Sequence, residues 1–284
     1  MTTTKTTLTA VCVAALGATS LHADDSVFSV SAFIAGIEGQ GFVGNESTEV
    51  GETWDFPSGQ DGSYYVYNVN DLPIEFEELV TSPSGGSSYG HSKCTAEVTS
   101  TNITFQASNL GVVDGGETGE YAAAYAHVHG EFHILIDKPA LIEFDFCNET
   151  NGTSAWGKLY LRKLQGGNFA TMYEHVTSSD SGEECVTGSV QVEPGLYQLY
   201  FSSYIYMNNE SIGVNGWEIA ASDSVATLNI TEINVADING DGTVDGADLA
   251  RLLGAWGTSA SGGDLNGDGI VNGADLALLL AAWD

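Results

Sequence analysis

Alternation of apolar and polar side chains at every second position is the feature that most restricts what this chain can fold into. The segment ALIEFDF, residues 140–146, places Ile142, Phe144 and Phe146 on one face and Glu143 on the other. A period of two is that of a β-strand with one buried face. Helical periodicity is almost absent before residue 236. Similar strand patterns are expected at residues 27–35, 63–69, 158–164, 189–193, 194–207 and 225–233.

Many short strands separated by polar, Gly-rich turns predict a mainly β fold for residues 24–233, an antiparallel β-sandwich or jelly roll. We expect a single domain there, although the Gly-rich segment 111–120 leaves a division into two smaller domains open. The segment EFEELV, residues 75–80, is expected to form at best one short helical turn. A small helical module is expected to follow at residues 236–284.

The charge of the chain argues against two classes of partner. With 38 acidic and 7 basic residues the formal net charge is −31 at pH 7. Such a surface repels phosphates and anionic lipid headgroups, so we expect no nucleic acid partner and no membrane insertion. Residues 1–23 read as a secretory signal peptide, with Lys5 before an apolar run and Ala23 before the cleavage point, so we expect a secreted protein, extracellular or associated with the cell surface.

Cysteine count is the next constraint. Removal of the signal would leave Cys94, Cys147 and Cys185. An odd number in an exported protein predicts one disulfide and one free thiol. Cys147 and Cys185 lie at the ends of two predicted strands and are the preferred pair, although sequence alone does not fix the connectivity.

A duplicated segment ends the chain: DINGDGTVDGADLARLLGAW (237–256) recurs as DLNGDGIVNGADLALLLAAW (264–283), with 15 of 20 positions identical. Each copy carries oxygen-bearing side chains at alternate positions of a twelve-residue loop and a glycine at the sixth, where the backbone turns sharply. Oxygen atoms at that spacing converge on a hard cation, so we expect two Ca²⁺ ions, one in each loop. The predicted ligands are Asp237, Asn239, Asp241, Thr243 (backbone carbonyl), Asp245 and Asp248, and then Asp264, Asn266, Asp268, Ile270 (backbone carbonyl), Asn272 and Asp275.

A short amphipathic helix is predicted after each loop, because leucine and tryptophan recur at i, i+3, i+4 and i+7. Either apolar stripe alone would face water, so we expect the two stripes to pack together. We also expect the valine at the eighth position of each loop to join the two loops by a β-type contact. Metal binding and packing would then fold the module jointly. These residues are Leu249, Leu252, Leu253 and Trp256, their repeats Leu276, Leu279, Leu280 and Trp283, and the valines Val244 and Val271.

The paired D-x-N-x-D-G and D-L-x-x-L-L motifs of residues 236–284 resemble a type I dockerin domain. Aspartate at the twelfth loop position and the absence of a helix before each loop distinguish the pattern from an ordinary EF-hand. The resemblance implies docking to a cohesin module on a scaffold or cell-surface protein, in a secreted polysaccharide-degrading system. Gly246-Ala247 and Gly273-Ala274 stand where dockerins often carry hydroxyl side chains, so the identity of the partner stays open.

Carboxylates in the segment EFDFCNE, residues 143–149, are weak catalytic candidates. Sandwich glycosidases similar to laminarinases carry their acids as E-x-D-x-E or E-x-D-x-x-E, whereas three residues separate Asp145 from Glu149 here. We also expect that Glu149 would need a bulge to join the face of Glu143 and Asp145. An ordinary solvent-facing strand is the favoured interpretation.

Histidines and aromatic residues supply two further candidates. In YAHVHGEFH, the residues His127, His129, Glu131 and His133 share one strand face, which would suit Zn²⁺, although the polar side of an ordinary strand is favoured. Tyr200 and Tyr204 lie opposite the apolar face of their strand and would make a platform for sugar rings, unless both faces are covered. Other aromatic candidates are Trp54, Trp156, Trp217, Tyr64, Tyr65, Tyr67 and Tyr206.

These observations lead to one expectation and two alternatives. We expect a secreted, calcium-binding modular protein, in which a dockerin-like plug docks a non-catalytic β-sandwich onto a cohesin-type or surface partner, and the sandwich binds glycan or protein. The first alternative is a dockerin-bearing polysaccharide hydrolase or lyase. The second is a cell-surface structural protein.

Overall fold

The structure is a computed structural model that describes residues 27–44, 50–53, 63–81, 85–116, 121–151, 155–177, 182–208, 217–259 and 262–283. The predicted signal peptide and Trp54 lie outside these residues. The strands are β1 (Phe28–Gly44), β2 (Val50–Thr53), β3 (Ser63–Val66), β4 (Ile74–Thr81), β5 (Ser87–Val98), β6 (Asn102–Asp114), β7 (Tyr121–Ile136), β8 (Ala140–Asn151), β9 (Ala155–Gln165), β10 (Asn168–Val176), β11 (Gly182–Val192), β12 (Gly195–Asn208) and β13 (Trp217–Glu232), with a 3₁₀ turn η1 (Val69–Asp71) and the helices α1 (Gly246–Gly254) and α2 (Gly273–Ala281).

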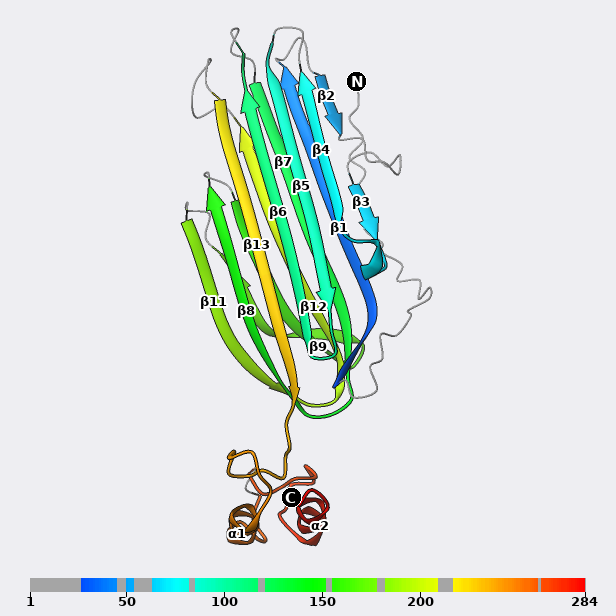
Figure 1. Cartoon of the computed structure of the whole chain (residues 1–284), viewed down its shortest axis with the longest axis vertical. Coiled ribbons are helices and arrows are strands. Elements are labelled where there is room, and N and C mark those ends of the chain that lie inside the picture. Colours follow the sequence, from blue (N-terminus) through cyan, green and yellow to red (C-terminus); the bar gives the residue numbers. More distant parts are fainter. Residues whose placement is uncertain are drawn as a thin grey trace.

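The strands form two antiparallel sheets that face each other, which confirms the predicted β-sandwich (Figure 1). The seven-stranded sheet has the order β10-β9-β12-β7-β1-β2, and β3 also pairs with β1. The six-stranded sheet has the order β11-β8-β13-β6-β5-β4. The two helices form a small module beyond the end of β13 (Figure 1). No helix among the described residues is long and apolar enough to cross a membrane.

The core lies between the sheets and is built by the alternation seen in the sequence. Ile142 and Phe146 are fully buried and Phe144 nearly so, as their shared parity predicts. Phe105 of β6 stacks on Phe201 of β12, with ring centroids 5.7 Å apart. A Cβ atom at position 130 of β7 would lie 2.4 Å from Cε2 of Phe105, so only glycine fits there. This contact lets the two sheets approach closely at the centre of the core.

A single β-bulge in β1 reverses which of its side chains face the core. Val30 pairs with Ile134 of β7, but Ala32 pairs with His133, so Ser31 is an extra residue in the strand. Before the bulge Phe28 is buried, and after it the buried hydrophobic side chains have odd numbers, Ile37 among them. A bulge of this kind inserts one unpaired residue and shifts the register of everything beyond it.

Buried polar side chains form a second, hydrophilic part of the interior. Oδ1 of Asn148 accepts hydrogen bonds from Ser222 Oγ at 2.9 Å and from Ser224 Oγ at 2.6 Å, and its Nδ2 donates to Thr177 Oγ1 at 2.8 Å. Buried polar groups are tolerated when they are paired in this way. The network therefore fixes β8 and β13 to the chain after β10.

A second buried asparagine continues this network toward the other edge of the sandwich. Oδ1 of Asn109 on β6 accepts a hydrogen bond from Ser92 Oγ at 2.7 Å, and its Nδ2 donates to the carbonyl of Ser203 on β12 at 2.9 Å. The hydroxyl of Ser203 then donates to the carbonyl of Ser222 at 3.0 Å. Asn109 thus bonds the six-stranded sheet directly to the seven-stranded one.

The expectation of a short helical turn at residues 75–80 is wrong and is corrected by strand pairing. The segment 75–80 belongs to strand β4, because its residues pair one for one with β5. Residues 111–114 are part of β6, and β6 and β7 belong to the two sheets of the sandwich. The sequence pattern alone did not show these pairings.

The cysteine prediction is confirmed. Cys147 of β8 and Cys185 of β11 face each other in the ladder and form a disulfide. Cys94 is a free, buried thiol, and burial raises its pKa to about 12. Since the thiolate is the reactive form, this cysteine is protected at neutral pH.

The helical module has a smaller core than the sequence predicts. Ala236, Val244, Leu252, Val271 and Leu279 are buried together, and Leu249 and Leu276 are partly buried against them. The other half of each apolar stripe is exposed, because two nine-residue helices cannot cover it. Exposed fractions are 51% for Leu253, 45% for Trp256, 54% for Leu280 and 42% for Trp283.

The expected contact between the two loop valines is also corrected. The N–H of Val271 donates to the carbonyl of Thr258 at 2.8 Å, and its carbonyl accepts from Gly257 at 2.8 Å. Val271 therefore pairs with the chain after α1 and not with Val244. Both valines are buried in the core of the module.

The buried network gives a direct test of what holds the sandwich together. Replacing Asn148→Ala should lower the free energy of unfolding by about 3 kcal/mol, because the hydroxyl groups of Thr177, Ser222 and Ser224 lose a buried partner. Asn229→Ala, at an exposed asparagine of β13, is the matched control and should change it by less than about 0.5 kcal/mol. Equal effects in urea unfolding would contradict a stabilising role for the network.

Candidate functional site

Aromatic side chains cover the outer face of the seven-stranded sheet. Neighbouring strands place Trp156 of β9 opposite Tyr204 of β12, and Tyr204 opposite His127 of β7. The rings of Trp156 and Tyr204 have centroids 3.8 Å apart, and Tyr125 of β7 meets Tyr204 edge-on at 5.1 Å. These four strand positions form one continuous surface of rings.

A second row of rings runs beside the first. Tyr160 of β9 stacks on Tyr200 of β12 with ring centroids 4.6 Å apart, and Tyr200 stacks on His129 of β7 at 6.0 Å. Tyr65 of β3 contacts His129 from the other side at 5.6 Å. We call this surface the aromatic face; its residues are Tyr65, Tyr125, His127, His129, Trp156, Tyr160, Tyr200 and Tyr204.

Polar side chains border the aromatic face. Oε1 of Glu131 accepts a hydrogen bond from Gln198 Nε2 at 2.7 Å and lies 2.6 Å from His133 Nε2. The guanidinium of Arg162 lies over the ring of Tyr160, with Cζ 3.9 Å from its centroid. The Nε atom of Arg162 is buried without a hydrogen-bond partner among the described residues. A donor and a carboxylate thus lie beside the rings.

Burial and neighbouring charges perturb the ionisable groups of this face. The contact with His127 is the largest cause that lowers the pKa of Glu38 to about 2. Burial lowers the pKa of His129 to about 4 and raises that of Tyr200 to about 12. Burial alone raises the pKa of Glu131, but the hydrogen bonds from His133 and Gln198 outweigh it and the pKa is lowered. Perturbed pKa values of this kind gather at functional sites.

The predicted histidine cluster is partly reproduced. His127, His129, Glu131 and His133 do share one face of β7, as their parity requires. They do not converge on one point, because Glu131 pairs with His133 while His127 and His129 turn toward Glu38 of β1. No sequence pattern indicated Glu38, because its position depends on the bulge in β1.

The predicted Tyr200 and Tyr204 platform is present on the face opposite the buried Tyr197, Leu199 and Phe201. The predicted candidate Trp156 extends it from β9, together with Tyr160 and Arg162, which the sequence pattern did not indicate. Trp217 lies elsewhere, with an exposed fraction of 66% at the start of β13 in the six-stranded sheet.

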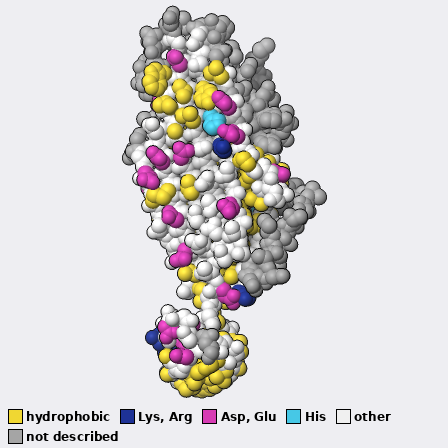
Figure 2. All heavy atoms as spheres, viewed as in Figure 1, with side chains coloured by type: hydrophobic (Ala, Val, Ile, Leu, Met, Phe, Trp, Pro, Cys, Tyr) yellow, Lys and Arg dark blue, Asp and Glu magenta, His cyan; other side chains and the backbone are white. Residues whose placement is uncertain are grey.

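The weak catalytic candidates lie on the outer face of the six-stranded sheet. Glu143, Asp145 and Glu149 are all exposed along β8. Glu149 shares their face without a bulge, which corrects the expectation that it would need one, because β8 pairs in unbroken register with both neighbours. Burial, followed by the charge of Glu149, raises the pKa of the adjacent Asp223. Figure 2 shows acidic side chains scattered over this face rather than gathered in a hollow.

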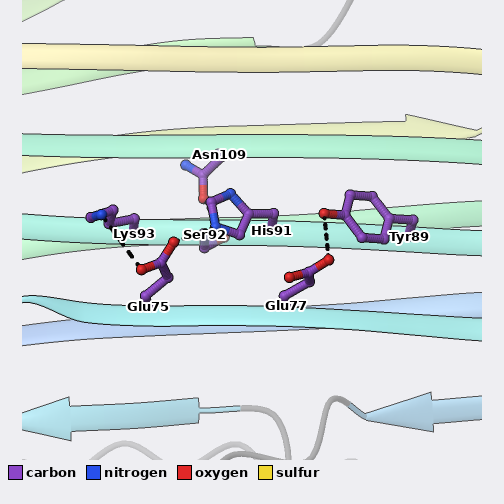
Figure 3. A network of polar contacts seen from close by, with 7 residues as sticks. All are labelled: Glu75, Glu77, Tyr89, His91, Ser92, Lys93 and Asn109. Carbon is purple, nitrogen blue, oxygen red and sulfur yellow. Dashed lines mark hydrogen bonds and ion pairs between the residues drawn. The ribbon is translucent and has the colours of Figure 1, made fainter.

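Another polar cluster on the six-stranded sheet lies at its β4 edge (Figure 3). Nε2 of His91 is 2.9 Å from Oε1 of Glu75, and Nζ of Lys93 is 3.5 Å from Oε2 of the same carboxylate. Tyr89 donates a hydrogen bond to Glu77 at 3.1 Å. These are ion pairs and hydrogen bonds between neighbouring strands, and each acidic group is already partnered.

The two loops of the C-terminal module are shaped by their own carboxylates. In the first loop Oδ2 of Asp237 accepts the N–H of Gly242 at 2.8 Å, and Oδ1 accepts that of Gly240 at 2.7 Å. Asp264 of the second loop accepts the N–H of Gly269 at 2.8 Å in the same way. Both sixth-position glycines have positive φ, 90° and 91°. The first-position carboxylates are therefore held toward the loop interior.

The twelfth-position carboxylates are buried beneath their loops. Asp248 accepts backbone N–H groups from Asn239 and Asp245, both at 2.9 Å. Asp275 accepts those of Leu265, Asn266 and Asn272. These backbone hydrogen bonds lower the pKa of both aspartates. Lowering the pKa keeps these two aspartates ionised, and the side chains expected as ligands in the loops offer oxygen atoms, which fit a hard cation such as Ca²⁺.

The other predicted ligands occupy positions compatible with that arrangement. Asn239 and Asn266 accept the N–H groups of Asp241 and Asp268. Asp245 and Asn272, at the ninth position of each loop, cap the helices by accepting the N–H groups of Ala247 and Ala274. This is compatible with cation binding, because ninth-position ligands often contact the ion through a water molecule. Thr243 and Ile270 follow at the seventh position, where the backbone carbonyl is the expected ligand.

No family model matches the chain, and no curated protein matches it. Among solved structures the chain is similar to the C-terminal CBM6 of LamC, a marine laminarinase from Zobellia galactanivorans, with a TM-score of 0.22, 10% identity, and coverage of 57% of this chain and 94% of that one.

Two further structures are similar to the same degree. One is the carbohydrate-binding module CBM6cm-2 from Cellvibrio mixtus lichenase 5A in complex with cellotriose, with a TM-score of 0.20, 11% identity, and coverage of 57% and 92%. The other is the Cowpea Mosaic Virus empty virus-like particle, with a TM-score of 0.23, 9% identity, and coverage of 76% and 88%. Likenesses of this size carry no argument about function, which rests on the residues of the chain itself.

Proposed function

We propose that this chain is a secreted, calcium-dependent modular protein that binds carbohydrate through the aromatic face and docks onto a partner through residues 236–284. The observation that carries the first part is the continuous surface of rings on the seven-stranded sheet. A pyranose ring presents C–H groups on its faces and hydroxyl groups around its edge. Aromatic rings with polar groups at their border suit both.

The border residues offer the hydrogen-bonding partners that sugar hydroxyls need. Glu131 accepts, Gln198 donates through its amide, and the guanidinium of Arg162 carries further donors beside the ring of Tyr160. All three point outward from the strands that carry the rings. We place the polar contacts of a bound sugar at this border and its ring on Trp156 and Tyr204.

Binding without catalysis is the reading that we favour for this face. Its acidic groups Glu38 and Glu131 are each held by a histidine or a tyrosine. The exposed acids of β8 lie on the other sheet, away from the aromatic face. The alternative of a polysaccharide hydrolase or lyase would be favoured if reducing sugar or an unsaturated product were released.

The carbohydrate proposal is tested by removing one ring. Tyr204→Ala takes away the ring that joins Trp156 to Tyr125, so affinity for a polysaccharide selected on a glycan array should fall by about tenfold or more, about 1.4 kcal/mol in calorimetry. Trp217→Ala, an exposed ring on the opposite sheet, is the matched control and should leave affinity unchanged. Absence of any glycan ligand, or equal losses in both variants, would contradict the proposal.

We propose further that each C-terminal loop binds one Ca²⁺ through Asp237, Asn239, Asp241 and Asp248 or their repeats. Ca²⁺ at a hundred times its Kd should stabilise the module by about 2.7 kcal/mol, because the ion binds only the folded loop. Asp275→Ala should reduce the bound calcium from two ions to one in equilibrium dialysis. Asp223→Asn, an acid on the sandwich, should leave both ions in place. A chain that binds no calcium would refute the proposal.

The exposed apolar side chains of the two helices support the proposal that residues 236–284 dock onto a partner. Leu253 and Leu280 occupy equivalent places in the two repeats, and hydrophobic side chains gather on the outer end of the module (Figure 2). Exposed apolar patches of this kind are typical of protein–protein contacts. The resemblance to dockerins makes a cohesin module the expected occupant.

A charge placed in this patch tests the docking proposal. Leu280→Asp should weaken binding of the calcium-loaded chain to a cohesin module by about tenfold or more, measured by calorimetry. Leu79→Asp, at an equally exposed leucine of β4, should not. If neither the native chain nor a variant binds any member of a cohesin panel, the docking proposal is wrong.

A further inference from the structure

Two histidines and a glutamate lie together at the centre of the aromatic face. His127 and His129 are two residues apart on β7, so both point outward from the same strand. Glu38 of β1 pairs directly with His127 in the sheet. One ligand atom from each of the three residues lies within 4.8 Å of the others. They belong to adjacent strands at the middle of a sheet, so the backbone holds them in place.

The Nδ1 atoms of the two histidines have no hydrogen bond among the described residues that would explain this arrangement. Nδ1 of His129 is buried and has no partner among the described residues. Nδ1 of His127 is 3.7 Å from Oε2 of Glu38, which is too long for a hydrogen bond. A buried nitrogen without a partner is costly, and few occur in native structures. The three side chains therefore direct ligand atoms toward one common region, and the bonding capacity of these atoms is not fully used by the described residues.

Tyrosines outside the cluster orient two of its members. The hydroxyl of Tyr65 donates to Oε1 of Glu38, which leaves Oε2 facing His127. The hydroxyl of Tyr200 lies 3.3 Å from Nε2 of His127. If Nε2 carries the proton and donates to Tyr200, the lone pair of Nδ1 points toward Glu38. Metal-binding histidines are commonly fixed through their other nitrogen in this manner.

We propose that Glu38, His127 and His129 form a binding site for Zn²⁺ or a similar divalent transition metal. Two ligands of a tetrahedral Zn²⁺, each about 2.1 Å from the metal, are about 3.4 Å apart. The His127–Glu38 distance of 3.7 Å is already close to that value. The three ligand atoms lie within 4.8 Å of one another, so side-chain shifts of about 1 Å bring them to coordination distance. The fourth position opens to the outer surface, where water or a sugar hydroxyl binds.

The ligand chemistry separates this site from the calcium loops. Imidazole nitrogen suits Zn²⁺, Cu²⁺ or Ni²⁺, whereas the all-oxygen loops suit Ca²⁺. The other cluster of metal-binding side chain types among the described residues, Cys147, Glu183 and Cys185, is excluded because its two cysteines form a disulfide. The proposed site does not depend on carbohydrate binding or on the docking module.

Cobalt provides the test, because tetrahedral Co²⁺ has a visible absorption band that Zn²⁺ abolishes on displacement. The full chain, with its loops saturated by Ca²⁺, should bind one Co²⁺ in a tetrahedral site and release it to Zn²⁺. His129→Gln and Glu38→Gln should each weaken Co²⁺ binding by about tenfold or more. His91→Gln is the matched control, since His91 also contacts a glutamate but on the other sheet.

Each outcome decides the proposal. Loss of the band in His129→Gln and Glu38→Gln but not in His91→Gln supports it. No band in the native chain, or a band unchanged in both cluster variants, overturns it. If circular dichroism shows that a cluster variant does not fold, the melting temperature of the native chain decides instead: Zn²⁺ added to the calcium-saturated chain must raise it, and no increase overturns the proposal.

Discussion

The side chains of β7 are divided between two environments, and most of the sandwich depends on that division. Its even-numbered residues fill the core, where Gly130 admits Phe105 and Phe132 packs against Phe201. Its odd-numbered residues must then face outward. Because β7 lies between β1 and β12, their outward residues align with its own. The same pairing that closes the core therefore assembles the aromatic face.

Buried asparagines complement this apolar packing. Phenylalanine side chains contact each other at many angles, whereas Asn109 and Asn148 accept only partners with the correct geometry. A polar network in a core contributes specificity of alignment when every member is paired. Asn109 bonds directly to β12, which carries Tyr200 and Tyr204 on its other side. Strand β12 therefore contributes both to the alignment of the two sheets and to the position of the rings.

Much of the sandwich could be predicted from sequence, because a period of two is visible within each strand. Ile142 and Phe146 are buried as their alternation indicates, and Cys147 joins Cys185. The segment 75–80 was misjudged because its charged residues obscure the alternation on an edge strand. The apolar stripes of the module were expected to be buried, but helices of nine residues leave Leu253 and Leu280 exposed. The identity of the module as a dockerin stays a prediction.

The candidate site was less predictable, since it depends on which strands are neighbours. His127 and His129 could be assigned to one face from their own strand, but Glu38 could not. The bulge at Ser31 explains why. If Ser31 were paired with His133 instead of bulged out, Ile37 would lie opposite His127 and face outward, and Glu38 would face the core. The chemistry of the aromatic face therefore depends on one irregularity of β1. Deletion of Ser31 would leave Glu38 beside the histidines, whereas regular pairing of the full-length strand would place an alkyl group there.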